Sequence, residues 1–269
     1  MEATEIRKLA ALEDTHWWYR ERRALLARAL RRLAAAGNGP DAANGNEPGS
    51  GNGPGSGNGP DAGNKAGNGT TGGRALDIGA AGGGNTRVLR AHGWRPVALE
   101  YSPEGAEVAA ERGLPVLRAD ARYLPLPSAS LGLVVAFDIL EHIEEDDLAA
   151  AEIRRTLRPG GTALIAVPCD MRLWSAHDVA VGHVRRYDRA SLVSVLEKAG
   201  LVVDELWSWN VVLRPVAAWR RRRSTGSDLD DLPALVNLGL RTIITAERYL
   251  PVKSLPGVSL MLRAHRPAS

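Results

Sequence analysis

The sequence is poor in sulfur, in long apolar runs and in net charge. Its one cysteine, Cys169, excludes an internal disulfide and a cysteine-based metal cluster, and it fits a reducing cytoplasm. No stretch reaches the roughly 18 uncharged apolar residues of a membrane span, and residues 1–11 lack the apolar run of a signal peptide. A net charge of +3 is too small to steer the whole protein to nucleic acid. We therefore expect a cytoplasmic protein without a nucleic-acid partner.

Glycine is abundant and unevenly distributed. Of 29 glycines, 14 fall in residues 37–73, where the hexapeptide Gly-Asn-Gly-Pro-Asp-Ala occurs at 37–42 and again at 57–62. The apolar side chains of this stretch, proline aside, are alanines, so nothing in it repays the entropy of ordering. The composition predicts a flexible linker, inserted between N-terminal helices in residues 1–36 and a globular core.

After this linker, segments typical of strands and helices alternate. Such alternation indicates a parallel sheet with helices on both faces, and ligands then bind at the edge where the strands end. We expect a core at 74–210, a helical substrate-side extension at 211–256, and a last strand with the tail at 257–269. The expected strands are 74–78, 96–100, 115–118, 131–137, 162–167, 201–207 and 257–262. The expected helices are 2–13, 20–36, 85–92, 103–112, 146–157, 189–199 and 232–250.

A glycine-rich turn follows the first expected strand. Residues 76–86 read Leu-Asp-Ile-Gly-Ala-Ala-Gly-Gly-Gly-Asn-Thr, so a strand ends in an acid, glycines follow, and a helix begins. This turn suits a ligand with a negative or hydrogen-bonding end near the helix N-terminus, although a tight strand–helix turn alone gives the same pattern. Glu100 ends the second strand, where an acid can accept both hydroxyls of a ribose. Asp120 follows the third strand, where an adenine amino group could bind.

Two further segments complete an ordered set of motifs, Phe-Asp-Ile-Leu-Glu-His at 137–142 and Leu-Arg-Pro-Gly-Gly at 157–161. From about 74 to 199 the sequence resembles the class I S-adenosylmethionine-dependent methyltransferases, and most of all the bacterial small-molecule enzymes of the "methyltransferase domain 11" type. It departs from the family at Ala81, which replaces the second glycine of the first motif. The resemblance implies an α/β fold with a seven-stranded Rossmann-like sheet, an antiparallel last strand and an N-terminal helical lid.

The resemblance also implies S-adenosylmethionine as cofactor, with S-adenosylhomocysteine as product. Asp77 and Gly79 would lie beside the methionine portion, Glu100 would bind the ribose, and Asp120 would hold the adenine. The full set of implied cofactor contacts is Trp18, Asp77, Gly79, Ala80, Glu100, Tyr101, Asp120, Ala121, Phe137 and Asp138. A nicotinamide enzyme is the weaker interpretation, because Ala81 interrupts the Gly-x-Gly-x-x-Gly fingerprint.

An aromatic cluster, His-Trp-Trp-Tyr-Arg-Glu-Arg at 16–22, precedes the linker. In similar methyltransferases a comparable segment covers the cofactor as a lid, and aromatic faces attract a sulfonium cation. Adjacent helical residues point about 100° apart, so we expect Trp18 but not its neighbour to face the cofactor, and Tyr19 to face the substrate. Alternatively, the aromatics only pin a helix to the sheet.

A second cluster, at 174–188, precedes the helix expected at 189–199. His177 and His183 are candidate general bases, since histidine titrates near neutrality. Arg186 and Tyr187 are candidate contacts to an acidic or hydroxylated substrate, and His142 is a further candidate. Hydrogen bonds that anchor the loop are the alternative role for this cluster. We expect no metal, because no ligand spacing in the sequence supports one.

The apolar segment 211–219 runs into four arginines, Arg220, Arg221, Arg222 and Arg223. This pattern suits an anionic membrane surface or a lipid-linked substrate, unless Asp228, Asp230 and Asp231 neutralise it. The predicted function is methyl transfer to an oxygen, nitrogen or carbon of a small molecule, in natural-product or in glycan or lipid-intermediate synthesis. A non-catalytic cofactor-binding regulator or assembly partner, and a membrane-surface scaffold, are the alternatives. The oligomeric state is left open.

Overall fold

The computed structural model describes residues 7, 10–41, 73–222 and 232–268. The bulk of the expected linker therefore lies outside the described residues, as do most of the expected helix 2–13, Arg223 and the three aspartates at 228, 230 and 231.

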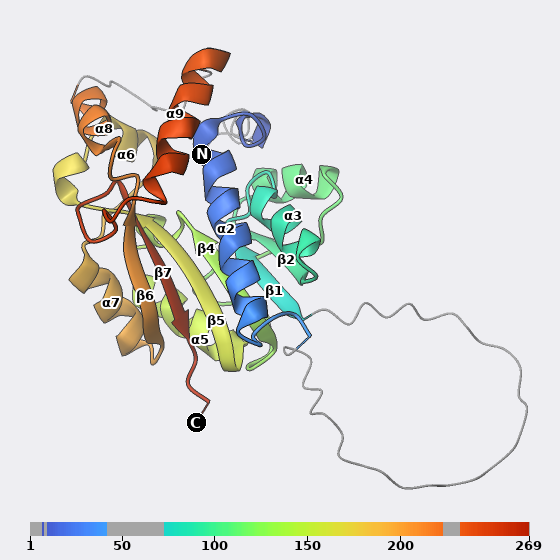
Figure 1. Ribbon diagram of the computed structural model, residues 1–269. Coiled ribbons are helices and arrows are strands. Elements are labelled where there is room, and N and C mark those ends of the chain that lie inside the picture. The colour runs from blue at the N-terminus through green and yellow to red at the C-terminus, as the bar shows by residue number, and fades with distance from the viewer. Residues whose placement is uncertain (1–6, 8–9, 42–72, 223–231, 269) are drawn as a thin grey trace, which may run out of the picture.

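The core is one seven-stranded sheet in the order β3-β2-β1-β4-β5-β7-β6 (Figure 1). The strands are β1 (Arg74–Ile78), β2 (Arg95–Glu100), β3 (Val116–Arg118), β4 (Leu131–Phe137), β5 (Leu157–Pro168), β6 (Val202–Trp209) and β7 (Ser259–His265). Strands β1 to β5 pair in parallel, and β7 lies antiparallel between β5 and β6. The expected Rossmann-like sheet with an antiparallel last strand is confirmed.

Helices cover both faces of the sheet. This cover is required because the side chains of β4 point alternately to the two faces and all of them are buried. Val134 and Ala136 pack in the cluster that contains residues of α5 (Asp146–Thr156) and α7 (Arg189–Lys198). Leu133 and Val135 pack on the opposite face, against α2 (Trp17–Ala35) and α3 (Gly84–Ala91). The remaining core helix, α4 (Pro103–Glu111), packs against β2 and β3. Because β1 to β5 run parallel, their C-terminal ends lie at one common edge of the sheet.

The N-terminal helix α2 is more than a lid. It begins at Trp17 rather than at the expected Arg20, and Leu26, Leu30 and Leu33 are buried in the layer that covers the sheet. Only its first two turns, residues 17–23, reach the edge where the parallel strands end. Most of α2 is thus part of the core.

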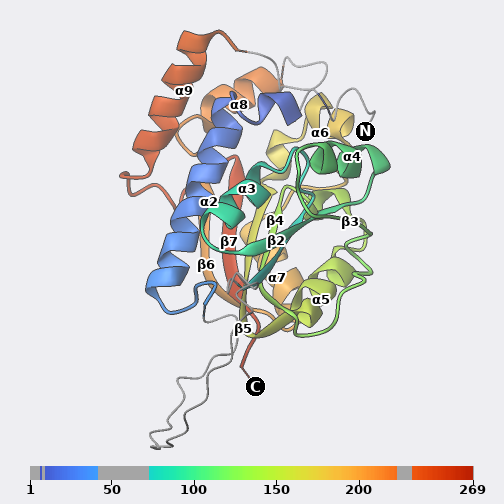
Figure 2. The same cartoon turned by 90° about the vertical axis from the view of Figure 1, so that its right-hand side faces the viewer.

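The C-terminal extension closes over the same edge and contacts the start of α2 (Figure 2). Its helices are α8 (Arg214–Arg221) and α9 (Ala234–Glu247), and α6 (Ala176–Val181) of the core lies at the same edge. The Asn237 side chain accepts a hydrogen bond from the Trp17 amide at 2.7 Å and donates one to the Thr15 carbonyl at 2.8 Å. Glu21 of α2 pairs with Arg248, just after α9. Segments from the two ends of the chain therefore form one cover. No helix among the described residues is long and apolar enough to cross a membrane.

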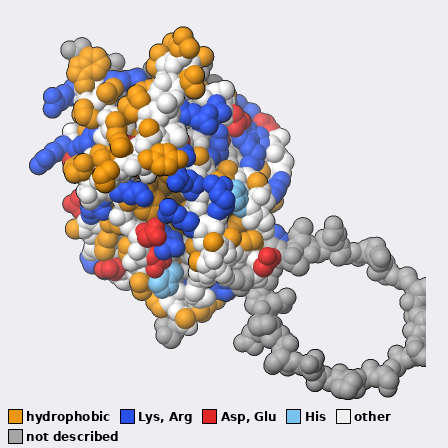
Figure 3. Space-filling model, viewed as in Figure 1, with side chains coloured by type: hydrophobic (Ala, Val, Ile, Leu, Met, Phe, Trp, Pro, Cys, Tyr) orange, Lys and Arg blue, Asp and Glu red, His pale blue; other side chains and the backbone are white. Residues whose placement is uncertain are grey.

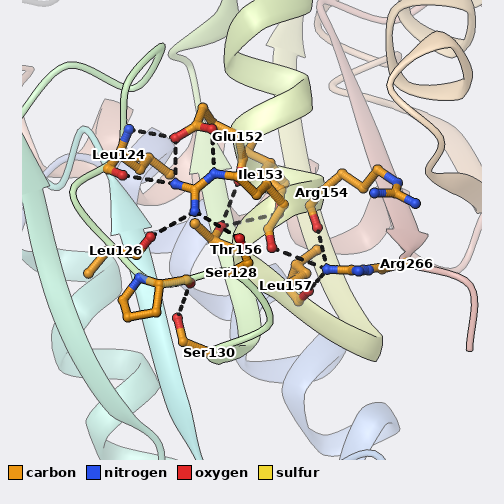
Figure 4. A network of polar contacts seen from close by, with 12 residues as sticks. Leu124, Leu126, Ser128, Ser130, Glu152, Ile153, Arg154, Thr156, Leu157 and Arg266 are labelled. Atoms are coloured by element: carbon orange, nitrogen blue, oxygen red, sulfur yellow. Dashed lines mark hydrogen bonds and ion pairs between the residues drawn. The ribbon is translucent and has the colours of Figure 1, made fainter.

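A polar network at the opposite end of the sheet joins α5, the loop before β4 and Arg266 (Figure 4). Arg155 pairs with Glu152 and donates to the carbonyls of Leu124 and Leu126 at 2.9 and 2.8 Å, which ties α5 to the loop before β4. The backbone of Arg266 exchanges hydrogen bonds with residues 160 and 161, both at 2.9 Å. This pairing lets β5 begin at Leu157, before the expected start at 162, because the Pro-Gly-Gly segment joins the strand.

Candidate active site

A cavity of about 540 Å³ opens at the C-terminal edge of the sheet, within the usual size range of small-molecule sites. The glycine turn borders one end, and three histidines border the other. Between them lies a wall of aromatic residues from the start of α2, and α8 and α9 supply an apolar roof. The roof residues are Leu213, Val216, Ala217, Leu232, Val236 and Leu240. One cavity therefore joins the glycine turn to the histidine cluster, the two regions that the sequence analysis identified.

The glycine turn has the backbone geometry that its sequence demands. Gly79 and Gly83 have φ values of 68° and 76°, in the left-handed region that favours glycine. Ala81 has φ 47° and so takes a conformation that costs an L-residue energy. Alanine at this departure from the family's glycine pattern therefore adopts the left-handed conformation that glycine adopts readily. The Gly84 amide, at the start of α3, donates to a Glu13 oxygen at 3.2 Å.

Asp77 is fully buried beneath this turn. One of its oxygens accepts a hydrogen bond from the Thr86 hydroxyl at 2.6 Å, and the other has no hydrogen-bond partner among the described residues. Burial raises the pKa of Asp77 to about 7, with Glu13 and Glu100 adding like charge. The residue thus supports the turn from below rather than bordering the cavity.

This raised pKa predicts a loss of stability with pH. A carboxyl group with a raised folded-state pKa stabilises the fold fully below its unfolded-state pKa, and the stabilisation disappears as pH rises through the folded-state value. Between pH 6 and 8 the Asp77 contribution to the free energy of unfolding should fall by about 1.4 kcal/mol. Urea unfolding at both pH values should show a smaller fall in Asp77→Asn than in the parent. Equal falls in the two proteins would contradict the assignment.

Glu100 lies at the end of β2, where its carboxylate accepts a hydrogen bond from the Ala81 amide. Burial raises the pKa of Glu100 to about 7. Farther along the sheet edge, Tyr101 is 71% exposed, Ala121 is buried, and Asp120 is paired with Arg122 at 2.7 Å. These four expected cofactor residues stand at the ends of β2 and β3, beyond the glycine turn, and do not border the cavity.

The aromatic wall of the cavity surrounds a buried arginine, Arg22. Its guanidinium carbon lies 5.0 Å from the ring centre of Phe137, and one of its nitrogens pairs with Asp138 at 2.6 Å. Both Trp17 and Trp18 border the cavity, although adjacent helical side chains point about 100° apart. The reason is that the cavity meets the beginning of α2, where consecutive side chains all reach its rim.

The histidine end of the cavity is assembled from three segments. The short 3₁₀ turn η2 (Leu140–His142) after β4 brings His142, α6 brings His177, and the loop after α6 brings His183. The ring centres of His142 and His183 are 4.7 Å apart, and those of His177 and His183 are 6.3 Å apart. Burial lowers the pKa of His142, and the charge of His183 adds to this effect.

Glu141 and Asp178 are the acids behind these histidines. Glu141 is fully buried, and burial together with the charge of Asp138 raises its pKa well above the usual range. Asp178 is also fully buried, and one of its oxygens lies 2.8 Å from His183 Nδ1. This contact fixes the His183 ring with its Nε2 atom directed away from Asp178.

The side chains of Arg186 and Tyr187 bind other residues of the protein and do not face the cavity. This corrects the expectation that they contact the substrate. The Arg186 guanidinium is buried against Asp178, at 2.7 and 2.8 Å, and donates to the Cys169 carbonyl. The Tyr187 hydroxyl donates to Asp146 at 2.5 Å. Neither side chain borders the cavity, and we place neither in the acceptor site.

Several polar residues that line the cavity escaped the sequence analysis as candidate site residues, among them Glu13, Arg22 and Asn210. Arg22 could have been found, since it ends the aromatic segment of the lid. Asn210 gave no signal: it follows β6 with a φ of 59°, and its buried side-chain oxygen has no hydrogen-bond partner among the described residues.

Comparison with known proteins agrees with the fold and the glycine turn. Residues 76–165 match the family described as a methyltransferase domain. A probable S-adenosylmethionine-dependent methyltransferase of Mycolicibacterium smegmatis is 31% identical over 137 residues, which cover 48% of this chain and 52% of the relative. A protein of the same description from Mycobacterium tuberculosis is 26% identical over 131 residues, or 47% of this chain and 48% of the relative. The chain thus spans about half the length of these curated relatives.

Among solved structures, a chain in the complex of the Haloferax volcanii Trm112 methyltransferase activator with a methyltransferase superposes with a TM-score of 0.52. It is 23% identical, and the match covers 72% of this chain and 83% of that chain. Sheet order, glycine turn and family match together define a Rossmann-like methyltransferase fold. The sheet order, the family match over residues 76–165 and the curated relatives together support a class I S-adenosylmethionine-dependent methyltransferase fold for the core of this chain.

The residues present fit the cofactor of this class. Glu100 offers a nearly buried carboxylate at the end of β2, and the glycine turn brings backbone close to the cavity. The cavity wall combines the aromatic faces of Trp18 and Phe137 with the carboxylate of Asp138. Aromatic faces and an acid are the groups that attract a sulfonium and an ammonium group.

Proposed function

We propose that this protein transfers a methyl group from S-adenosylmethionine to a small acceptor that has a polar end and an apolar body. The observation that supports this is the single cavity that runs from the glycine turn to the histidines under an apolar roof. A polar acceptor atom would lie beside His177 and His183, and the rest of the acceptor would contact Val216, Val236 and Leu240.

In this proposal each end of the site has a separate task. S-adenosylmethionine, when bound, supplies an electrophilic methyl group on a positively charged sulfur. Glu100 would accept hydrogen bonds from the ribose hydroxyls, and Asp138, held in place by Arg22, would attract the positively charged sulfur. The cover formed by α2, α8 and α9 keeps water from the reacting atoms, which strengthens the electrostatic contacts inside.

The histidine end handles the proton of the acceptor. Asp178 fixes the orientation of the His183 ring, so that Nε2 can accept a proton when an acceptor hydroxyl or amine loses one. His177 borders the same space and is the second candidate for this step. Positioning the acceptor in line with the methyl group contributes more to the rate than base strength, because methyl transfer depends on close alignment.

The test is a product assay with the purified full-length protein, S-adenosylmethionine and a panel of amphiphilic alcohols, phenols and amines. Mass spectrometry should detect S-adenosylhomocysteine together with an acceptor heavier by one methyl group. His183→Ala should slow turnover by about 10²–10⁴-fold if this ring removes the proton. Cofactor binding without methylation of any acceptor class would favour a regulatory role and contradict the proposal.

We also propose that the roof of the cavity contacts an anionic membrane surface. Helix α9 has apolar side chains on both sides: Val236 and Leu240 border the cavity, while Leu235 and Leu238 are 83% and 59% exposed. Figure 3 shows apolar and basic side chains gathered over the end of the molecule formed by α8 and α9. Apolar side chains beside arginines are typical of segments that lie in a membrane interface.

This contact predicts vesicle binding. Sedimentation with phosphatidylcholine vesicles that contain phosphatidylglycerol should carry the protein down, and added salt should release it. Arg220→Gln with Arg222→Gln should weaken binding about tenfold or more, because each arginine near such a surface contributes about 1 kcal/mol. Leu235→Ser with Leu238→Ser should also weaken it, whereas Tyr123→Ser, at an exposed aromatic residue on another loop, should not. Binding that none of these changes affects would contradict the proposed surface.

A further inference from the structure

We propose that Glu141, His142 and His183 form a binding site for one divalent transition-metal ion of the Zn²⁺ or Fe²⁺ type. One ligand atom from each residue can be chosen so that all three lie within 4.8 Å of one another. All three residues border the cavity. Two imidazoles and one carboxylate form a ligand set that transition metals prefer, whereas Mg²⁺ and Ca²⁺ prefer sites made of oxygen atoms.

Both histidines are oriented as metal ligands usually are. His183 Nδ1 lies 2.8 Å from a buried carboxylate oxygen of Asp178, and His142 Nδ1 lies 3.1 Å from the Gly182 carbonyl oxygen. Each contact fixes one ring nitrogen and leaves Nε2 for another partner. A carboxylate or a backbone carbonyl behind the ring is the arrangement that holds metal-binding histidines in place.

Glu141 supplies the second, independent observation. Its side chain is 0% exposed, yet neither of its oxygens accepts a hydrogen bond from a described residue. The nearest partner is His183 Nε2, 3.8 Å from Oε1, a separation too long for a hydrogen bond. A buried carboxylate without partners is costly, and buried acids are normally paired or bound to a metal ion. An ion between Glu141 and the two rings would give all three groups a partner, once small side-chain rotations bring the ligand atoms to metal-bonding distance.

Protein ligands occupy only three positions, so an ion bound here would keep at least one open position for the contents of the cavity. If the protein has the proposed function, an acceptor hydroxyl bound to the metal would lose its proton more easily. This role of the ion rests on the proposed function, whereas the metal site itself does not. His183 would then be a ligand, and His177 would remain to accept the proton. Local spacing in the sequence gave no hint of the site, because its ligands come from the loop after β4 and the loop after α6.

The experiment measures metal binding in the absence of cofactor and acceptor, with full-length protein that has no histidine tag. After treatment with a chelator, calorimetry with Zn²⁺ should show one site per chain, and Co²⁺ should produce visible absorption bands from nitrogen and oxygen ligands. Glu141→Gln and His183→Ala should each weaken binding by about 100-fold or more, since each removes a direct ligand, and Asp178→Asn by about 10- to 100-fold.

His265→Ala is the matched control, because His265 also lies 2.8 Å from an aspartate, Asp204, but belongs to no group of three possible ligands among the described residues. It should bind metal as the parent does. Circular dichroism identifies any variant that fails to fold, and Glu141→Gln, which keeps the size and shape of the side chain, is the variant least at risk. The proposal is overturned if the parent binds neither ion, or if Glu141→Gln and His183→Ala bind as tightly as the parent. Methyl transfer that persists without metal would leave the proposed function intact and overturn the role of the ion.

Discussion

Asp178→Ala is expected to destabilise the protein by about 3–5 kcal/mol, the largest stability effect that the described contacts predict. The side chains of Asp178 and Arg186 are both 0% exposed and lie 2.7 Å apart. Removing the carboxylate would leave a buried guanidinium with one remaining hydrogen bond, to the Cys169 carbonyl at 3.2 Å. An unpaired buried charge costs far more than the net value of the pair itself.

Chemical denaturation of the parent and the variant at neutral pH measures this effect. Asp204→Ala is the control, because Asp204 pairs with His265 and Arg263 on the partly exposed edge of the sheet. That variant should lose at most about 1 kcal/mol, as exposed ion pairs do. Asp178→Ala combined with Arg186→Met should recover much of the lost stability, since no unpaired charge remains. A loss below about 1 kcal/mol for Asp178→Ala would show that water or a rearranged loop compensates Arg186.

The sheet could be predicted from the sequence because its strands are short apolar runs bounded by clear turns. The run at 131–137 is buried on both faces and forms β4 with those bounds. Helix α2 and strand β5 begin earlier than expected, because contacts with distant residues determine where they start. The Trp17 amide donates to Asn237, and residues 160 and 161 pair with Arg266, so partners far along the chain extend both elements. Local patterns contain no information about such partners.

The candidate site was predictable only in part, for a related reason. Order along the chain placed the glycine turn, Glu100 and Asp138 at strand ends, where a parallel sheet must bring them to one edge. It did not show which polar residues of the 174–188 segment face the cavity. His183 does so, while Arg186, in the same loop, is buried against Asp178. A polar side chain that borders the cavity and one that is buried in an internal ion pair have similar charge and hydrogen-bonding capacity. Only the packing of α6 determines which role each residue takes.

Glu100→Ala is expected to weaken S-adenosylmethionine binding by about 100-fold or more. A carboxylate that accepts two hydroxyl hydrogen bonds contributes about 1.5–3 kcal/mol for each bond to a charged group, and alanine removes both. Loss of the acid should not unfold the protein, because burial disfavours its charged form and its recorded hydrogen bond is with the Ala81 amide. Calorimetry with S-adenosylmethionine measures the change, and Glu107→Ala, at an exposed residue of the neighbouring α4, is the control.

The pKa of Glu100, about 7, adds a pH dependence that separates this role from a structural one. Only the ionised carboxylate accepts both ribose hydrogen bonds, so cofactor affinity should rise between pH 6 and pH 8 and level off above that range. In Glu100→Gln this Glu100-dependent rise should be absent, with affinity about tenfold or more below the parent at pH 8, because an amide cannot become charged. If Glu100→Gln keeps both the parent's affinity and its full pH dependence, Glu100 does not hold the ribose. The acid at the end of β2 would then serve only to fix the Ala81 amide and the shape of the glycine turn.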